Sequence, residues 1–483
     1  MRLHPIVLDK IPLVRDIIGE NTVYYTHSSA TLKTTSHAPQ SLSPGVSRLN
    51  HHALVDYLSC AFVPGERTMF DGVHELRPGA QWDGLGIAPK DVPFQLNEDH
   101  FDRPQSWYAN HLRELLEAVI ATQLQDVRNQ PVGIFLSGGL DSSLVAAFVK
   151  KLHTGPVHTI SIHFGDAYPS ELAWSSAVAA HIGSEHHILE VPTSIIASRT
   201  RDVMGMLDDP IGDPLTTPNL LMFEHAKSLG ITHIFNGEGG DPTFGGPKNV
   251  PMVLHHLYGG DLQDLSGMYF RSFQKCYDDL DELLTARVLR PTHEEQSRLL
   301  TPYLQDDTAV MSSFLNRLMW MNVRLKGADH ILAKVRNLGF HTKVQACSPL
   351  FDRRIVQAGF EIPAVLKLNG RREKAVLKDA VAGMLPEAVI ERPKSGMMVP
   401  VQRWFRGPLR PWAESVLLDK TACLAPYLNR SVIEGWLRYE QMTYPRHGVK
   451  IWLIIALELW MQTHGFPAEP WTKSTHRRNF WSW

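Results

Sequence analysis

One stretch decides the fold of this chain: Ile134-Phe135-Leu136-Ser137-Gly138-Gly139-Leu140-Asp141-Ser142-Ser143-Leu144-Val145. The apolar run from Val132 to Leu136 predicts a buried strand. After the Ser/Gly turn, the apolar spacing from Leu144 to Lys151 predicts a helix. A strand that enters a helix through such a turn gathers unpaired backbone N–H groups at the positive end of the helix dipole. That arrangement suits an anion such as a phosphate.

The side chains of this turn extend the expected phosphate site. Ser137, Ser142 and Ser143 supply hydroxyl donors, and the two glycines let the main chain approach a ligand closely. Asp141 places a carboxylate where a divalent cation would lie against phosphates. The turn lacks both the Gly-Lys-Ser/Thr ending of the Walker loop and the dinucleotide fingerprint. These seven residues alone leave open a Gly-rich turn in an ordinary α/β domain.

The segment Ser137-Gly138-Gly139-Leu140-Asp141-Ser142-Ser143 resembles the pyrophosphate loop of the ATP pyrophosphatases. The resemblance implies that ATP is cleaved between its α and β phosphates and that AMP is left on a substrate carboxylate. It also implies that Ser137, Gly138, Gly139, Asp141 and Ser142 bind ATP. Backbone groups at Leu136 and Ile162 would then border the adenine.

The following elements predict an α/β fold with a doubly wound parallel sheet. Strands are expected at Val157–Ile162 and His187–Val191, with a helix from about Glu171 to His181 between them. Strands that alternate with helices form parallel sheets, and ligands bind at the carboxyl ends of those strands. From residue 261 onward the pattern predicts mostly helices, including Phe314–Lys326 and Ile451–Gln462.

Composition and charge favour a cytoplasmic globular protein. The formal net charge is −2, so no overall field attracts nucleic acid or a membrane surface. No stretch approaches the roughly 18 apolar residues of a membrane span, and the first residues lack a signal-peptide core. The four cysteines lack metal-like spacing, which favours incidental thiols in a reducing compartment.

A second motif runs from His233 to Gly246, where another buried strand ends in glycines beside carboxylates. Asp141 and Asp241, from two strand ends, could hold one Mg²⁺ across the phosphates of ATP, because oxygen ligands suit that ion. The motif resembles the asparagine synthetase pattern Ser-Gly-Glu-Gly-x-Asp-Glu-x-Phe-Gly-Gly, which implies roles for Gly237 in ATP binding and Glu238 in catalysis. Asn236 and Pro242 depart from that pattern.

Further matches to the asparagine synthetase family extend from Arg15 to the C-terminal helix. Residues 1–104 resemble the end of the family's glutaminase domain with its connecting hairpin, and residues 105–483 resemble the synthetase domain. The family's glutaminase begins with a cysteine, but the first cysteine here is Cys60. A truncated glutaminase remnant without glutamine hydrolysis is therefore expected.

Two lysines and one acidic loop complete the expected site. Lys374 lies in a stretch that resembles the family's phosphate-contacting segment, although a cationic helix face is also commonly solvated. Lys394 lies in a Pro/Gly-framed loop, and the resemblance implies that it stabilises charge as the acyl-adenylate forms and reacts. The loop Asp208–Pro214 is either substrate-facing or a stiffened helix cap.

The resemblance implies an ATP-dependent, AMP-forming amide ligase that requires ATP and Mg²⁺. Its substrate would be a small-molecule or peptide carboxylate, with ammonia or an amine supplied from solution or by a separate partner. One alternative is a cyclase of the beta-lactam synthetase or lasso peptide type, in which the amine belongs to the same molecule. Beta-lactam synthetases carry a tyrosine at the position of Glu238. The other alternative is a non-catalytic nucleotide-binding subunit.

Overall fold

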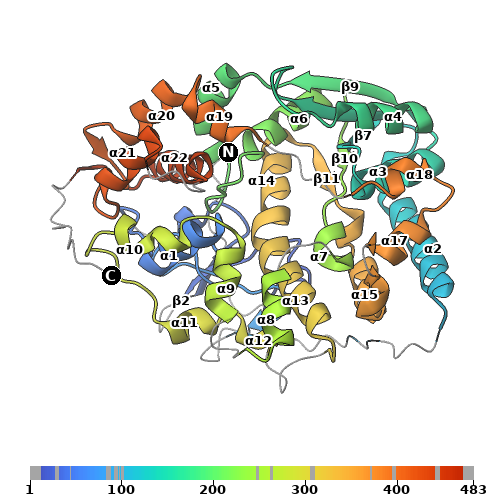
Figure 1. The fold of residues 1–483 in the computed structure, drawn as a ribbon, viewed down its shortest axis with the longest axis horizontal. Coiled ribbons are helices and arrows are strands. Elements are labelled where there is room, and N and C mark those ends of the chain that lie inside the picture. The colour runs from blue at the N-terminus through green and yellow to red at the C-terminus, as the bar shows by residue number, and fades with distance from the viewer. Residues whose placement is uncertain are drawn as a thin grey trace.

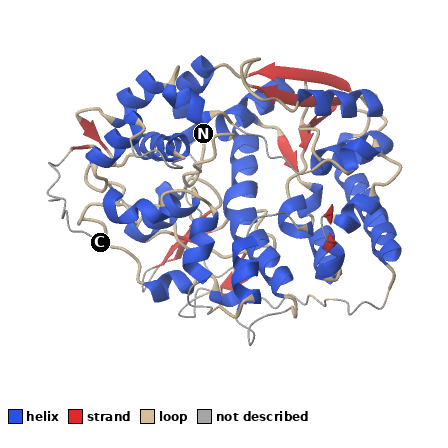
Figure 2. Ribbon diagram, viewed as in Figure 1, coloured by secondary structure: helices blue, strands red, loops and turns tan. Residues whose placement is uncertain are grey.

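The computed structural model describes most of the chain, and Lys394 lies outside the described part. The described residues are 12–27, 32–43, 45–82, 89–91, 96, 98, 103–245, 250–260, 265–304, 311–369, 372–393, 399–440 and 446–471. Figures 1 and 2 show a small sheet flanked by many helices. No helix in these ranges is long and apolar enough to cross a bilayer.

A five-stranded parallel sheet is the centre of the nucleotide half, in the order β11-β10-β7-β8-β9. Its strands are β7 (Val132–Phe135), β8 (Val157–His163), β9 (Glu185–Glu190), β10 (His233–Phe235) and β11 (Gln345–Cys347). The chain winds outward from β7 in one direction through β8 and β9, and in the other through β10 and β11. The crevice at such a switch point, between β7 and β10, is where ligands bind in doubly wound sheets. The predicted fold class is confirmed.

Helices cover both faces of this sheet (Figure 1), and alternating side chains of the central strand pack against them. Val132 and Ile134 are buried in one cluster with α2 and α3, while Phe135 packs in another with α5 and α6. Successive residues of a strand point to opposite faces, so this apolar run covers both. The helices of this half are α2 (Gln105–Gln123), α3 (Leu140–Leu152), α4 (Leu172–Ile182), α5 (Thr193–Met204) and α6 (Thr216–Ser228).

A long helical rod crosses the middle of the molecule and departs from the predicted helix Phe314–Lys326. It begins as α13 (Phe314–Asn322), continues as a π-helical segment (Val323–Leu332) and ends as α14 (Ala333–Thr342). The apolar pattern located the start of the rod but gave no sign of the π-helical segment, which is a rare conformation. The rod carries residues that reach both the nucleotide half and the N-terminal part.

Of the remaining helices, α7 and α8 precede residue 261, and those from α9 onward confirm the mostly helical pattern predicted after it. They are α7 (Gly240–Phe244), α8 (Val250–Leu257), α9 (Leu265–Ser272), α10 (Leu280–Leu283), α11 (His293–Ser297), α12 (Thr301–Leu304), α15 (Arg353–Glu361), α16 (Ala364–Lys367), α17 (Ala375–Ala380), α18 (Glu387–Ile390), α19 (Val401–Arg406), α20 (Arg410–Leu417), α21 (Arg430–Arg438) and α22 (His447–Thr463). Two short antiparallel pairs accompany them, β12 (Leu368–Asn369) with β13 (Arg372–Glu373) and β14 (Thr421–Ala422) with β15 (Glu469–Pro470).

The N-terminal part is β-rich. Antiparallel strands form the sheets β3-β2-β4 and β1-β5-β6, and a buried helix, α1, lies between β3 and β4 in sequence. The bounds are β1 (Leu13–Val14), β2 (Tyr24–His27), β3 (Leu32–Thr35), α1 (His51–Cys60), β4 (His74–Glu75), β5 (Ala80–Trp82) and β6 (Lys90–Asp91).

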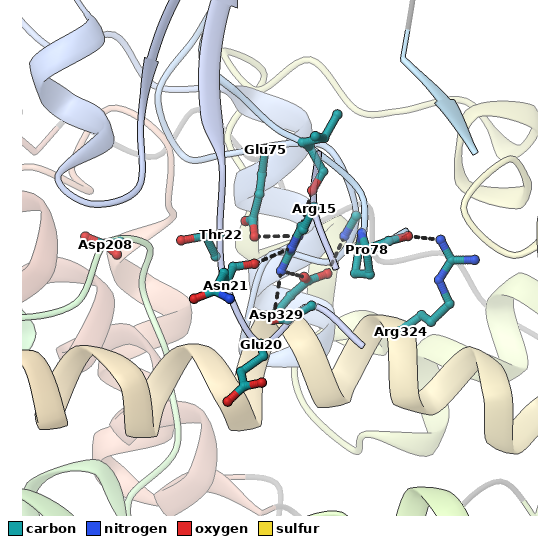
Figure 3. Close-up of polar contacts among 12 residues, drawn as sticks. Arg15, Glu20, Asn21, Thr22, Glu75, Pro78, Asp208, Arg324 and Asp329 are labelled. Atoms are coloured by element: carbon teal, nitrogen blue, oxygen red, sulfur yellow. Dashed lines mark hydrogen bonds and ion pairs between the residues drawn. The ribbon is translucent and has the colours of Figure 1, made fainter. Parts of the chain in front are cut away.

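This N-terminal part packs into the body of the molecule. The Tyr57 hydroxyl on α1 donates a hydrogen bond to the Leu453 carbonyl of α22 at 2.9 Å. Arg15 is fully buried between Glu75, at 2.8 Å, and Asp329 of the π-helical segment, at 3.5 Å (Figure 3). The division of the chain at residue 104 stays a prediction, because residues on both sides of it share one hydrophobic cluster.

Candidate active site

Hydrogen bonds to the hydroxyls of Ser137 and Ser142 fix the shape of the turn Ser137–Ser142, called the phosphate loop below. The Ser137 backbone N–H donates to the Ser142 hydroxyl at 3.2 Å, and the Gly139 N–H donates to the Ser137 hydroxyl at 3.3 Å. Helix α3 then begins at Leu140 without a side-chain cap. The positive end of its dipole therefore faces the space beyond the carboxyl end of β7, where an anion would be stabilised.

Two glycines bring the loop after β10 into contact with the phosphate loop. A Cβ atom at Gly237 would lie 2.4 Å from the Ser142 backbone nitrogen, and one at Gly240 would lie 2.3 Å from Asp141 Oδ1. Any larger residue would separate the two loops. Between these glycines, the Glu238 N–H donates to the Asn236 side-chain oxygen at 3.0 Å, which fixes the start of the turn.

Lys374 joins the two predicted metal aspartates. Its Nζ lies 2.5 Å from Asp141 Oδ2 and 2.7 Å from Asp241 Oδ1, and its side chain is only 4% exposed. Burial by itself would lower the pKa of Lys374, but the two carboxylates raise it above its usual value, so the ammonium stays charged. The residue precedes α17 in a left-handed conformation, at φ 54°, which turns the chain into the site.

The donor set fits a magnesium ion. Asp141 and Asp241 meet on one Nζ atom, so their carboxylates lie close together. Asp141 Oδ1 is buried and makes no hydrogen bond within the described chain. Mg²⁺ binds one or two protein carboxylates together with substrate phosphates, and this pair lies directly beside the phosphate loop.

A cavity of about 1010 Å³ opens over these groups. Ten of the predicted site residues line it: Leu136, Ser137, Gly139, Asp141, Ser142, Ile162, Gly237, Glu238, Asp241 and Lys374. Gly138 is not among the lining residues. A Cβ atom there would lie 2.4 Å from the Ser175 nitrogen of α4, and its φ of +75° favours glycine. Gly138 therefore lets the loop pack closely against α4. Pro393, next to Lys394, lines the cavity.

Several charged residues of the site were missed by the sequence analysis. Arg392 donates to the Gly138 carbonyl at 3.2 Å and pairs with Glu171 at 2.6 Å. Arg372 pairs with Glu391 at 2.7 Å. All four charged residues, Glu171, Arg372, Glu391 and Arg392, line the cavity. Two sequence features could have identified these residues: the cationic run from Arg371 to Lys378, and the position of Arg392 two residues before Lys394.

The hypothesis that the acidic loop Asp208–Pro214 faces the substrate is wrong for its carboxylates. Asp208 accepts from the Ala38 N–H at 2.8 Å, and Asp209 accepts from the Met69 N–H at 2.9 Å. Asp213 pairs with the buried Lys334 at 2.7 Å. None of the three is among the residues that line the cavity. The loop anchors the N-terminal part and the central rod, because those elements supply the nearest donors.

Comparison with known proteins agrees with this geometry. The family model described as asparagine synthase matches residues 111–462. Asparagine synthetase [glutamine-hydrolyzing] 1 of Bacillus subtilis is 23% identical over 478 residues, which covers 92% of this chain and 74% of that protein. Amidase chyE of Penicillium rubens is 24% identical, over 71% of this chain and 61% of its own length.

Among solved structures, the NH3-dependent NAD synthetase from Campylobacter jejuni matches with a TM-score of 0.23 at 15% identity, over 35% of this chain and 80% of that one. The match of the family model over most of the chain is the deciding observation. The chain belongs to the asparagine synthase family and is a carbon–nitrogen ligase that uses ATP and forms AMP and pyrophosphate.

Proposed function

We propose that this chain activates a substrate carboxylate as an acyl-adenylate and transfers the acyl group to ammonia or an amine. The observation that carries the proposal is the single cavity that unites the phosphate loop, the Asp141–Lys374–Asp241 cluster and Glu238. A phosphate-binding turn alone would serve many reactions. Beside it, the buried Lys374 ammonium and a Mg²⁺ ion held by the two carboxylates would neutralise the charge of a leaving pyrophosphate.

ATP would lie with its phosphates on the turn Ser137–Ser142 and its adenine against Leu136 and Ile162. Asp141 and Asp241 would hold Mg²⁺, which when bound supplies charge neutralisation across the phosphates. The Leu136 N–H already donates to the Ile160 carbonyl at 2.9 Å, so the adenine would contact carbonyl or side-chain atoms of Leu136. Arg392 would hold the phosphate loop through Gly138.

The chemistry has two steps. A substrate carboxylate oxygen attacks the α phosphorus, the bond from that phosphorus to the bridging oxygen breaks, and pyrophosphate leaves with the electron pair. The amine nitrogen then attacks the acyl carbon and loses a proton, while AMP leaves with the former carboxylate oxygen. Glu238 lines the same cavity and would orient the amine or accept its proton, and Lys394 would stabilise charge in both steps.

The amine would not come from glutamine hydrolysed by a cysteine of the described chain. All four cysteines, Cys60, Cys276, Cys347 and Cys423, are buried and free. Burial raises the pKa of the Cys60 thiol well above its usual value and that of Cys347 to about 12. A cysteine nucleophile needs an accessible thiolate, and none of these provides one at neutral pH. Ammonia or an amine from solution, from a partner or from the substrate itself is therefore proposed.

An isotope experiment tests the acyl-adenylate. The protein is incubated with ATP, Mg²⁺, ammonium ions and a panel of ¹⁸O-carboxylate acids that includes aspartate. We expect AMP, pyrophosphate and one ¹⁸O atom in the phosphate of AMP. Release of ADP as the sole nucleotide product would overturn the proposal, and so would AMP without the label.

A further inference from the structure

The cavity has a second wall that the nucleotide site does not account for. It is supplied by α6, α13, the π-helical segment and α14 rather than by the loops at the strand ends. Helix α13 packs against α7, which carries Asp241, so this wall adjoins the phosphate site. Its lining residues are mostly apolar: Leu215, Met222, Leu315, Leu318, Met319, Ile331 and Val335.

The volume leaves room for a second ligand beside ATP. Pockets for one drug-sized ligand span roughly 300–1,000 Å³, and this cavity reaches about 1010 Å³. The polar side chains of the second wall are Asn219, Asn322 and Lys326. Such a ratio of apolar surface to a few polar groups is typical of a site for an organic molecule rather than for a small ion.

Resting on the proposed function, we infer that the activated substrate is a carboxylic acid with an apolar alkyl or aryl body. The carboxylate would face Asp241 and the phosphate loop, and the body would lie against Met222, Leu315 and Met319. Aspartate would place an ammonium and a second carboxylate against this surface, where charges are costly unless each one is paired. An apolar body would instead gain binding free energy from the burial of its surface against this wall.

Pyrophosphate exchange tests the substrate class without knowledge of the amine. The full chain is mixed with ATP, Mg²⁺, labelled pyrophosphate and either aspartate, octanoate or 3-phenylpropionate. We expect exchange into ATP with an apolar acid at a KM at least about tenfold below that for aspartate. The fastest exchange with aspartate would overturn the inference and leave the adenylation proposal standing. ATP binding without exchange for any acid would overturn both.

A matched pair of variants assigns the effect to the apolar wall. Leu315→Asp places a charge on the half-buried part of the wall, while Leu289→Asp changes a leucine that is 69% exposed and does not line the cavity. We expect Leu315→Asp to raise the KM for the apolar acid about tenfold or more, with the KM for ATP unchanged as evidence of a folded site. Equal KM values in the two variants would overturn the assignment.

A separate observation, at the opposite end of the sheet, points to a metal site. In the register of β8 and β9, His158 pairs with Glu185, and His187 follows two residues later on the same face. His158 Nδ1 lies 3.1 Å from His187 Nε2. The Glu185 carboxylate approaches both rings, with 3.6 Å from one oxygen to His158 Nδ1 and 3.6 Å from the other to His187 Nε2.

The two distances of 3.6 Å match an edge of a tetrahedral site, and the 3.1 Å between the two imidazole nitrogens is slightly shorter than such an edge. Zinc bonds of about 2.0–2.2 Å to nitrogen and oxygen at tetrahedral angles place neighbouring ligand atoms roughly 3.3–3.6 Å apart. His225 on α6 lies beside His187, with ring centroids 5.1 Å apart, and its Nε2 is buried without a hydrogen-bond partner in the described chain. Two imidazoles and a carboxylate, with a third imidazole nearby, form a donor set that suits Zn²⁺.

We propose that His158, Glu185 and His187 bind a divalent transition metal ion, with the chemistry favouring Zn²⁺. The site lies at the amino end of β8, whereas Ile162 of the nucleotide site lies four residues further along. At about 3.3 Å per residue the two are roughly 13 Å apart. The ion would clamp β8 to the edge strand β9 and would not take part in the ligase reaction.

Titration of chelator-treated full chain with Zn²⁺ tests this site. We expect one tight equivalent by calorimetry, a Zn²⁺-dependent rise in melting temperature and a tetrahedral d–d spectrum with Co²⁺. His187→Ala, and Glu185→Gln as the milder change, should weaken this binding at least about tenfold, while the exposed control His181→Ala should not. Absence of the equivalent in the wild-type protein, or its persistence in both site variants, would overturn the proposal.

Discussion

Lys374 shows how one side chain organises the candidate site. The sequence placed it in a cationic stretch but gave no sign that it would be buried between Asp141 and Asp241, because its partners lie more than 100 residues away. Two aspartates so close together would repel without it. The lysine therefore keeps the two carboxylates in position.

We expect Lys374→Met to reduce the rate of AMP formation by about 10²-fold or more, because it removes a preorganised charge beside the reacting phosphates. The measurement is kcat/KM with the best acid of the exchange panel, together with circular dichroism. Lys151→Met is the control, since Lys151 pairs with Glu117 on the surface. A rate within threefold of the wild type would contradict the role given to Lys374.

Lys367 provides a pH-dependent prediction at the residue scale. Burial lowers its pKa to about 7, and its Nζ donates to the Asn316 side-chain oxygen at 2.8 Å. An unfolded lysine keeps its proton up to about pH 10. Between pH 7 and pH 10 the unfolded state therefore binds more protons than the folded state, so this group makes stability rise with pH.

Lys367→Met should therefore be more stable than the wild type at pH 7. Its advantage in the free energy of unfolding should shrink by up to about 1.4 kcal/mol per pH unit toward pH 10. Urea unfolding of both proteins at pH 7, 8, 9 and 10 measures this difference. A constant difference across that range would show that Lys367 is protonated in the folded state throughout.

At the scale of elements, the site exists because two strand-end loops touch. Gly237 stands at the contact, where a Cβ atom would meet the backbone of Asp141 and Ser142. Gly237→Ala should weaken ATP binding at least about tenfold, because main chain on both sides must move apart. Gly205→Ala is the control, since its nearest atom would be 3.4 Å away and its φ is negative. Calorimetric ATP affinities that agree between the variants would contradict this account.

The elements also show which features the sequence could predict. The strand in the run Val132–Leu136 was predicted correctly because an apolar run followed by turn residues is a local signal. The π-helical segment Val323–Leu332 and the anchoring role of Asp208 were not predicted. Both depend on partners distant in sequence, and no local pattern encodes such contacts. The cavity residues came mainly from motifs, whereas Arg392 required the folded positions of Gly138 and Glu171.

At the scale of the whole molecule, the N-terminal part is built into the ligase body through a buried charge cluster. Arg15 pairs with Glu75 and Asp329 (Figure 3). It also donates to the Leu76 carbonyl at 2.8 Å, and the Gly65 N–H donates to Asp329 at 2.8 Å. Burial raises the pKa of Asp329 well above its usual value, and the Glu75 charge adds to this. The Arg15 guanidinium is thus the counter-charge of both Glu75 and Asp329.

Arg15→Met should lower the free energy of unfolding by about 3–5 kcal/mol, because it leaves buried carboxylates without their counter-charge. Glu75→Gln in the same background should recover part of that loss by removing one of the stranded charges. The exposed pair of Arg298 and Glu294 supplies the control, and Arg298→Met should change stability by no more than about 1 kcal/mol.

Because α1 and α22 share one hydrophobic cluster, urea unfolding followed by tryptophan fluorescence and by far-UV circular dichroism should give one coincident transition in every variant. Two separate transitions for Arg15→Met would show that the N-terminal part is an independent unit, and a loss below 1 kcal/mol would show that the cluster does not hold it in place.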